Sequence, residues 1–132
     1  VLEAGRVVIA DRFQLSTEAY QCGGRGLDRA LFRTANRAAT GGLEPDLTLL
    51  FDVDVEEALR RLASRARQDA GDAPTRFDLE RAEFHDRVRR GYLAIAAREP
   101  HRIRIIDANR PIGEIGAEVD RLVGELRCRS VN

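Results

Sequence analysis

Three short apolar runs are separated by longer segments of helical periodicity, and this alternation limits what the chain can fold into. The runs are Val7–Ala10, Leu47–Val53 and Ile103–Asp107. The middle run is almost continuously apolar, which is typical of a strand buried on both faces. Strands that alternate with helices favour a parallel sheet with right-handed crossovers. We therefore expect an α/β fold with three layers around a parallel sheet.

The intervening segments predict helices. A long helix should run from about Asp78 to Arg98, where Pro100 ends it. A short helix over Leu15–Gln21 should break at the glycine-rich sequence that begins with Cys22. Further helices are expected over Asp28–Thr40, from Val55 to about Ala66, and from Pro111 onward, and a polar loop over Gln68–Thr75. The predicted buried stripe of the long helix is Phe84, Val88, Tyr92, Ile95 and Ala96, and that of the last helix is Ile112, Ile115, Val119, Leu122, Val123 and Leu126.

Charge and composition exclude several classes of function. All 22 basic residues are Arg, and 22 acidic residues balance them, so no bulk charge indicates a nucleic-acid partner. No apolar run approaches the length of about 18 residues that a membrane span needs, and no signal-peptide pattern opens the chain. We expect a cytoplasmic protein whose two cysteines, Cys22 and Cys128, are free thiols.

The first residues are typical of the tail of a helix that leads into a strand. Position 1 is Val and not Met. We therefore expect further residues upstream of Val1.

Ligands in open parallel α/β sheets bind beyond the carboxyl ends of the strands. The segments at these ends are Asp11-Arg12, Asp52–Asp54 and Asp107–Pro111. Arg presents a rigid fork of donors that matches phosphate oxygens, and Asp can bind Mg²⁺ or orient the Arg. Asp11-Arg12 therefore predicts phosphate chemistry, and a plain ion pair at a strand end is the alternative.

The residues around this pair form an ordered series of motifs. Asp11-Arg12-Phe13 is followed by Leu15-Ser16-Thr17, Ala19-Tyr20-Gln21, Gly23-Gly24-Arg25-Gly26 and, further on, Pro45-Asp46-Leu47-Thr48-Leu49. In this order the motifs resemble the thymidylate kinase family, over about residues 2 to 126.

The resemblance implies a P-loop NTPase fold of the nucleoside monophosphate kinase type, in one domain over residues 1–132 with a lid at about 65–77. It implies an enzyme that transfers the γ-phosphoryl group of ATP to dTMP, giving ADP and dTDP for dTTP synthesis. Mg²⁺ as a cofactor and a homodimeric assembly are implied with it. dTMP and ATP would be the small-molecule substrates.

The resemblance also implies roles for residues of the first motif series. Arg12 would bind the acceptor phosphate, and Asp11 would act near Mg²⁺. Ser16, Thr17 and Gln21 would lie along the thymine edge, and Tyr20 would pack near the sugar. Alternatively, Tyr20 is a core aromatic residue, and Ser16 and Thr17 cap a helix N-terminus.

Two later segments are assigned to the donor side by the same resemblance. Arg65, Arg67 and Arg76 would be catalytic arginines of the lid, and a solvated helix face is the alternative. Asn109, Arg110 and Pro111 would approach the adenine ring, where Arg110 could stack. The sequence departs from the family pattern at Thr75, Asp78 and Cys22, the last of which stands where most members have Gly.

One element of the family's chemistry is missing from the printed residues. They contain no G-x-x-x-x-G-K-[ST] motif and no Lys. We therefore expect these residues to be inactive alone, with the phosphate-binding loop upstream of Val1. The alternatives are a non-catalytic nucleotide-binding relative, or another nucleoside monophosphate or deoxynucleoside kinase.

Overall fold

The computed structural model describes residues 2–58, 60–61 and 76–129. In chain order its elements are η1 (Leu2–Ala4), α1 (Gln14–Glu18), η2 (Ala19–Gly24), α2 (Arg29–Thr40), β1 (Thr48–Asp52), α4 (Arg76–Arg98), β2 (Ile103–Asp107) and α5 (Ile112–Arg129). Residues 55–58 and 60–61 are also helical, as the sequence predicts for the start of that helix. The rest of that predicted helix and the loop Gln68–Thr75 lie outside the described residues.

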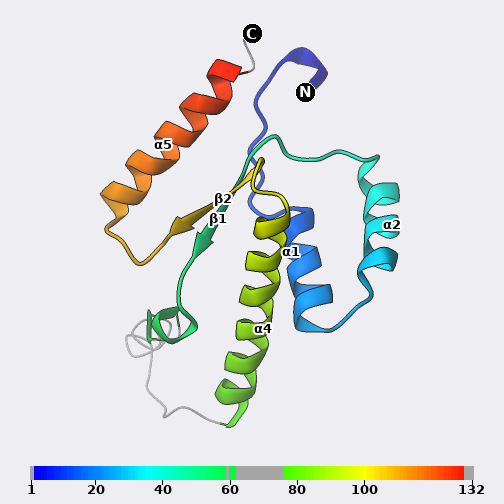
Figure 1. The fold of residues 1–132 in the computed structure, drawn as a ribbon, viewed down its shortest axis with the longest axis vertical. Helices are drawn as coiled ribbons and strands as arrows, with labels where there is room; N and C mark the ends of the chain where they lie inside the picture. The colour runs from blue at the N-terminus through cyan, green and yellow to red at the C-terminus, as the bar shows by residue number, and fades with distance from the viewer. Residues whose placement is uncertain (1, 59, 62–75, 130–132) are drawn as a thin grey trace.

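A parallel pair of strands forms the centre of the fold. β1 and β2 pair from Thr48 opposite Ile103 to Asp52 opposite Asp107, so two of the three predicted strands are confirmed. Leu50 and Ile103 pack against α4, whereas the buried Ile106 points to the other face, toward α5. Figure 1 shows α4 and α5 on opposite sides of the strands, which gives the expected three layers.

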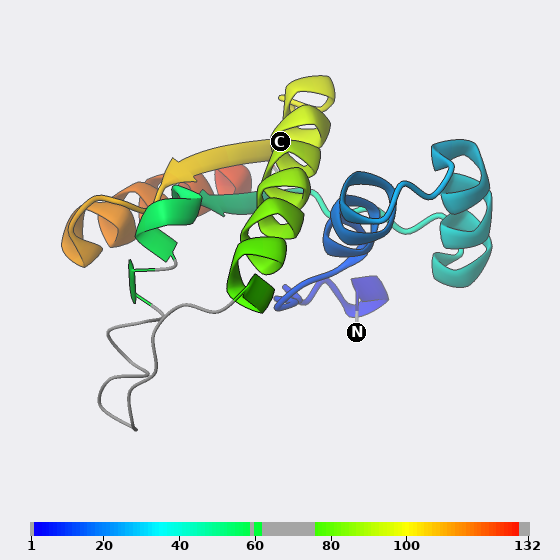
Figure 2. The same ribbon diagram turned by 90° about the horizontal axis from the view of Figure 1, so that it is seen from below.

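α4 carries the main hydrophobic core. Val88, Ile95 and Ala96 are buried, and Phe84 and Tyr92 pack against the cluster, so the predicted stripe is confirmed. Figure 2 shows α4 between the strands and the pair α1–η2, so this one helix joins the sheet to the N-terminal helices.

α1 and η2 form one continuous helical segment. The glycine-rich sequence ends it, as predicted, but the predicted last residue, Gln21, is wrong by three residues. The helix continues to Gly24 in a π-helical turn. A Cβ on Gly91 of α4 would lie 3.2 Å from the Gly23 Cα and 3.3 Å from the Ala19 carbonyl oxygen. The glycines therefore allow the two backbones to touch just before the helix ends at Gly24.

The predicted strand Val7–Ala10 is also wrong. The segment has no regular structure, and the side chains of Val7 and Ile9 are 81% and 93% exposed. A strand needs a partner for its backbone groups, and β-branched composition alone does not supply one. Among the described residues, no strand pairs with this segment.

The ends of the remaining helices follow the sequence signals. Asp28 caps α2 by accepting from the Leu31 N–H at 2.8 Å, and Gly41 ends it with a left-handed φ of 63°. In α5, Leu122 is buried, but Ile112 at the start is 88% exposed, so the predicted stripe is only partly covered. No helix in the described ranges has both the length and the apolar character needed to cross a membrane.

Candidate functional site

Arg12 has an unusual backbone conformation. Among the described non-glycine residues it alone has a positive φ, at 69°. The left-handed region costs a residue with a Cβ about 1–2 kcal/mol, and such strain collects at functional sites. The turn places the Arg12 guanidinium 5.9 Å from the centroid of the Tyr20 ring. Arg12 and Tyr20, two of the predicted site residues, therefore lie together.

Aromatic rings surround Tyr20. Its ring meets Phe84 edge-on at a centroid distance of 6.0 Å and Tyr92 at 6.5 Å. The Arg87 guanidinium lies 5.8 Å from the Phe84 centroid. Tyr20 is half-buried, so it borders the core and also contacts the Arg12 cation. The packing of Tyr20 against the core agrees with the interpretation as a core aromatic residue, and its role beside the sugar stays a prediction.

Ser16 joins this cluster through Tyr92. The Tyr92 hydroxyl donates to Ser16 Oγ at 2.9 Å. The predicted capping role of Ser16 and Thr17 is wrong, because Phe13 occupies the N-cap position without a side-chain cap. The helix begins at Gln14, one residue earlier than the predicted helix, which puts both hydroxyls inside it.

Gln21 faces Arg25 at the end of the same segment. The Arg25 NH1 donates to Gln21 Oε1 at 3.0 Å. Sequence reasoning did not name Arg25, Phe84, Arg87 or Tyr92 as site residues. The helical spacing of Phe84 and Tyr92 indicated burial but not which segment they would meet.

Asp11 stands apart from these contacts. It is exposed, and the described residues show no ion pair between Asp11 and Arg12. Nor does any group of three Asp, Glu, His or Cys side chains within the described ranges form a metal site. Asp11 could supply one carboxylate ligand, and Mg²⁺ is commonly held by one or two carboxylates together with water and substrate phosphates.

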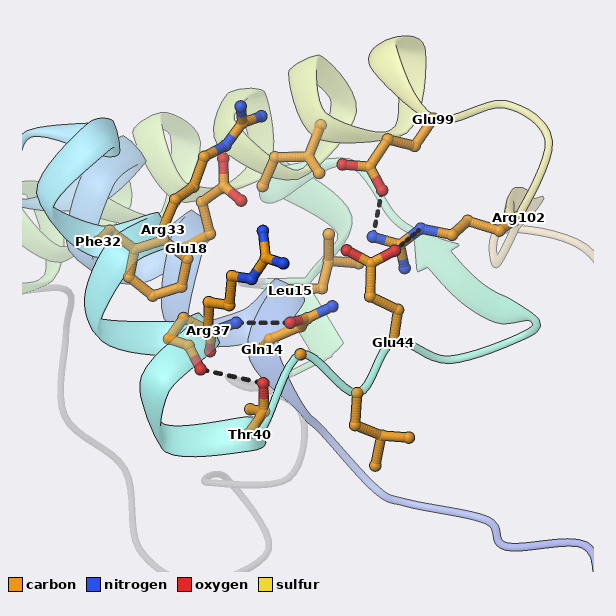
Figure 3. A pocket seen from close by; sticks show the side chains of 14 residues that line it. Gln14, Leu15, Glu18, Phe32, Arg33, Arg37, Thr40, Glu44, Glu99 and Arg102 are labelled. Carbon is orange, nitrogen blue, oxygen red and sulfur yellow. Dashed lines mark hydrogen bonds and ion pairs between the residues drawn. The ribbon is translucent and has the colours of Figure 1, made fainter. Parts of the chain in front are cut away.

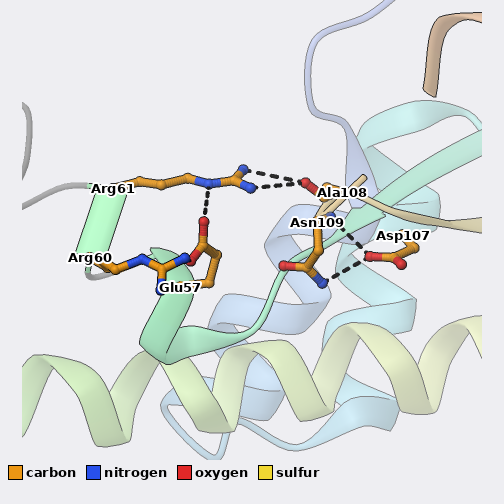
Figure 4. Close-up of polar contacts among 6 residues, drawn as sticks. All are labelled: Glu57, Arg60, Arg61, Asp107, Ala108 and Asn109. Atoms are coloured by element: carbon orange, nitrogen blue, oxygen red, sulfur yellow. Dashed lines mark hydrogen bonds and ion pairs between the residues drawn. The ribbon is translucent and has the colours of Figure 1, made fainter. Parts of the chain in front are cut away.

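The loop after β2 is held by its own side chains (Figure 4). Asp107 Oδ1 accepts from the Asn109 backbone N–H at 2.9 Å and from its side-chain amide at 2.8 Å, and these two bonds lower the pKa of Asp107. Arg61, from the helical residues 60–61, donates to the Ala108 carbonyl at 3.3 Å and to Glu57 at 2.7 Å. The predicted adenine-binding loop thus has a defined shape.

Arg110 is already engaged in this loop. Its guanidinium pairs with Glu118 of α5, which raises the pKa of Arg110, and its Nε donates to the Asp107 carbonyl at 3.3 Å. Pro111 is exposed directly before α5. The Arg110 guanidinium is therefore held against α5 and the loop, and its stacking on an adenine ring stays a prediction.

Arg89 connects α4 to the carboxyl end of β1. Its Nε lies 2.7 Å from Asp52 Oδ1, and its NH2 lies 2.8 Å from Asp52 Oδ2 and 2.9 Å from Asp54 Oδ1. The hydrogen bond with Asp52 is the main cause that raises the pKa of Arg89. Sequence reasoning marked Asp52–Asp54 as a strand end but gave no partner for it.

The structure does not describe the side chains of the three predicted lid arginines. Arg65 and Arg67 lie outside the described residues, as does Thr75. Arg76 is the first residue of α4, but its side chain is not described. Their catalytic role stays a prediction.

A cavity of about 510 Å³ lies elsewhere, between α1, α2 and the carboxyl end of α4 (Figure 3). Some of its polar groups pair with one another: Asn36 donates to Gln14 at 2.6 Å, and Glu99 pairs with Arg102. None of the predicted site residues lines it. The candidate site therefore consists of two parts. One is the Arg12 cluster, formed by Arg12, Ser16, Tyr20 and Tyr92. The other is the loop after β2.

A family model and three curated relatives that match this chain all carry the name thymidylate kinase. The thymidylate kinase family model matches residues 1–119. The chain is 53% identical over 131 residues to the thymidylate kinase of Desulfovibrio desulfuricans, which covers 98% of the chain and 56% of that protein. It is 47% identical to that of Desulfosudis oleivorans over 119 residues, or 89% and 56% of the two chains. It is also 47% identical to that of Solidesulfovibrio magneticus over 126 residues, or 95% and 60%.

The chain thus spans a little more than half the length of these curated relatives. The family model covers most of its residues, including the Arg12 cluster and the loop after β2. The chain belongs to the thymidylate kinase family.

Proposed function

We propose that the protein transfers the γ-phosphoryl group of ATP to dTMP, giving ADP and dTDP. The observation that carries the proposal is the Arg12 guanidinium, held in a left-handed turn beside the ring of Tyr20. A fixed, exposed guanidinium suits a phosphate, and the adjacent ring suits a sugar. A nucleoside monophosphate presents these two groups next to each other.

The base would lie along the helical segment that follows Arg12. Ser16, Thr17 and Gln21 supply hydroxyl and amide groups with both donors and acceptors, which a pyrimidine edge requires. Ser16 and Gln21 are half-buried, and Thr17 is exposed. In this arrangement Tyr20 limits the space at the sugar and so favours a deoxyribose.

The donor nucleotide would be bound by the loop after β2 and by the predicted lid arginines. Asn109, Arg110 and Pro111 would border the adenine ring, with Arg110 as the stacking partner. Arg65, Arg67 and Arg76 would meet the negative charge that spreads over the transferred group. Asp11 would supply one carboxylate ligand to Mg²⁺, and no step of the transfer is assigned to it.

We also propose that the enzyme acts as a homodimer in the cytoplasm, as the family resemblance implies. Sedimentation of the protein expressed from its complete gene tests the assembly. A dimer is expected at micromolar concentration, and a monomer under the same conditions would contradict it.

A substrate panel tests the proposed reaction. The protein expressed from its complete gene is assayed with ATP and dTMP, dUMP, CMP or AMP. We expect the highest kcat/KM for dTMP. A preference for CMP or AMP would identify another nucleoside monophosphate kinase, and calorimetric binding of dTMP without turnover would identify a non-catalytic relative.

A further inference from the structure

We propose that Tyr92 is a positioning residue, which orients the Ser16 hydroxyl so that Ser16 donates its hydrogen to a carbonyl oxygen of the bound base. The inference rests on the proposed function, because it assigns a specificity determinant to the same site. It concerns a contact between α1 and α4 that the sequence did not predict.

The geometry of the pair supports this role. The Tyr92 hydroxyl oxygen lies 2.9 Å from Ser16 Oγ, and both residues are half-buried. The Tyr92 ring is held edge-on against Tyr20 at 6.5 Å. The phenol oxygen is therefore attached to a ring that is itself packed, and its partner has little freedom to turn away.

The chemistry of the two hydroxyls sets the direction of the bond. A phenol is a stronger acid than an aliphatic alcohol, so the Tyr92 hydroxyl is the better donor. Ser16 then uses one of its two acceptor sites and keeps its own hydrogen. That hydrogen is available to a third group.

Ser16 also lacks the partner that helix hydroxyls usually find. Thr34 and Thr40 in α2 each donate to the carbonyl four residues earlier, both at 3.0 Å. The described contacts give the Ser16 hydroxyl no such bond; its only partner there is Tyr92. The Ser16 hydrogen is therefore not used within the helix.

The position of Ser16 directs this hydrogen to the site. Ser16 lies four residues before Tyr20 in the continuous helical segment, so the two belong to one face, and Arg12 lies over the Tyr20 ring. A pyrimidine in contact with Arg12 through its phosphate and Tyr20 through its sugar would bring a ring carbonyl near Ser16. Thymine, uracil and cytosine all carry such an acceptor oxygen.

Close backbone packing holds the pair in register. Gly23 of η2 and Gly91 of α4 touch, since a Cβ at Gly23 would lie 3.1 Å from the Gly91 Cα. Tyr92 is the next residue along α4. The close approach of the backbones therefore holds α4 against the segment that carries Ser16.

The test is a double-mutant cycle in the protein expressed from its complete gene. We expect Tyr92→Phe to raise the KM for dTMP about fivefold while kcat and the KM for ATP stay within about twofold. Ser16→Ala should raise the KM for dTMP at least as much. The KM for dTMP of the double variant should equal that of Ser16→Ala, because the Tyr92 hydroxyl acts only through Ser16.

Thr34→Val is the matched control, because it removes a hydroxyl whose bond stays inside α2. It should leave all three kinetic constants unchanged. A wild-type KM for dTMP in Tyr92→Phe, or multiplicative effects in the double variant, would overturn the positioning role alone. A wild type that does not phosphorylate dTMP would overturn the proposed function and this inference with it.

Discussion

Arg12 combines, at the level of one residue, a recognisable sequence motif with a strained backbone conformation. Its motif could be recognised in the sequence, but its positive φ could not, because only glycine and a few small polar residues signal that conformation. The contact with Tyr20 gives the conformation a physical reason. Side-chain pairs formed across long sequence separations, such as Tyr92 with Ser16, were equally invisible in the sequence.

Asp107 provides a prediction about pH. The Asn109 backbone N–H and then its side-chain amide lower the pKa of Asp107. A lowered carboxyl pKa contributes stability above the unfolded-state pKa of about 3.9, and this contribution is lost as the pH falls through the folded-state pKa. Asn109→Ala removes only the second bond, so the pKa of Asp107 should rise part of the way toward its ordinary value.

NMR titration of the Asp107 carboxyl carbon measures this change. Asn36→Ala is the control, because its amide bonds Gln14 in a different part of the fold. An unchanged Asp107 titration in Asn109→Ala would contradict the assignment.

Among the elements, α4 organises the molecule. Within four residues it contacts the end of β1 through Arg89, η2 through Gly91 and α1 through Tyr92. Its hydrophobic face was predictable from spacing alone, because helical periodicity is a local signal. The identity of its partners was not, because periodicity indicates that a face is buried but not against which segment.

The same reasoning explains what was missed about two elements. The glycine-rich sequence ends the helix as predicted, but its contact with α4 was not foreseen, because glycine signals either a helix end or a close backbone approach and the sequence does not distinguish them. The strand predicted at Val7–Ala10 failed because strand pairing depends on a partner, whereas the helices α2 and α5 carry their end signals within their own sequence.

The contact between Gly91 and η2 gives a stability prediction. Gly91→Ala puts a methyl group against the Gly23 backbone, and we expect it to lower the free energy of unfolding by about 1–3 kcal/mol. Gly116→Ala is the matched control, since a Cβ there meets nothing within 4 Å and should stabilise the helix by roughly 0.5–1 kcal/mol. Urea unfolding measures both. Equal effects of the two variants would contradict the close packing of α4 on η2.

Arg89 gives a second prediction for α4. Arg89→Ala leaves Asp52 and Asp54 close together without their shared cation, so the free energy of unfolding should fall by about 2–3 kcal/mol. Arg90 is the next residue, and Arg90→Ala removes only its exposed ion pair with Asp86. This variant should lower the free energy of unfolding by less than about 1 kcal/mol. Thermal unfolding compares them, and an Arg89→Ala variant as stable as Arg90→Ala would show that the pair does not anchor α4.

At the scale of the whole molecule, the family explains how the parts combine. Membership gives the chain the P-loop NTPase fold class, and the parallel strands between α4 and α5 agree with it. The printed residues contain no Lys and no phosphate-binding loop motif. The features that they do carry, the Arg12 cluster and the loop after β2, suit the acceptor nucleotide and the adenine ring in the proposed reaction.

The most direct test of the account is the rate of dTMP-dependent ADP formation by the protein expressed from its complete gene. Wild type should show this activity, and Arg12→Ala and Arg76→Ala should each lower kcat at least about tenfold, on the order of 1.4 kcal/mol. Arg127→Ala, which removes an exposed charge on α5, should leave kcat unchanged. A wild type without dTMP-dependent turnover, or an Arg12→Ala variant with the wild-type rate, would contradict the account.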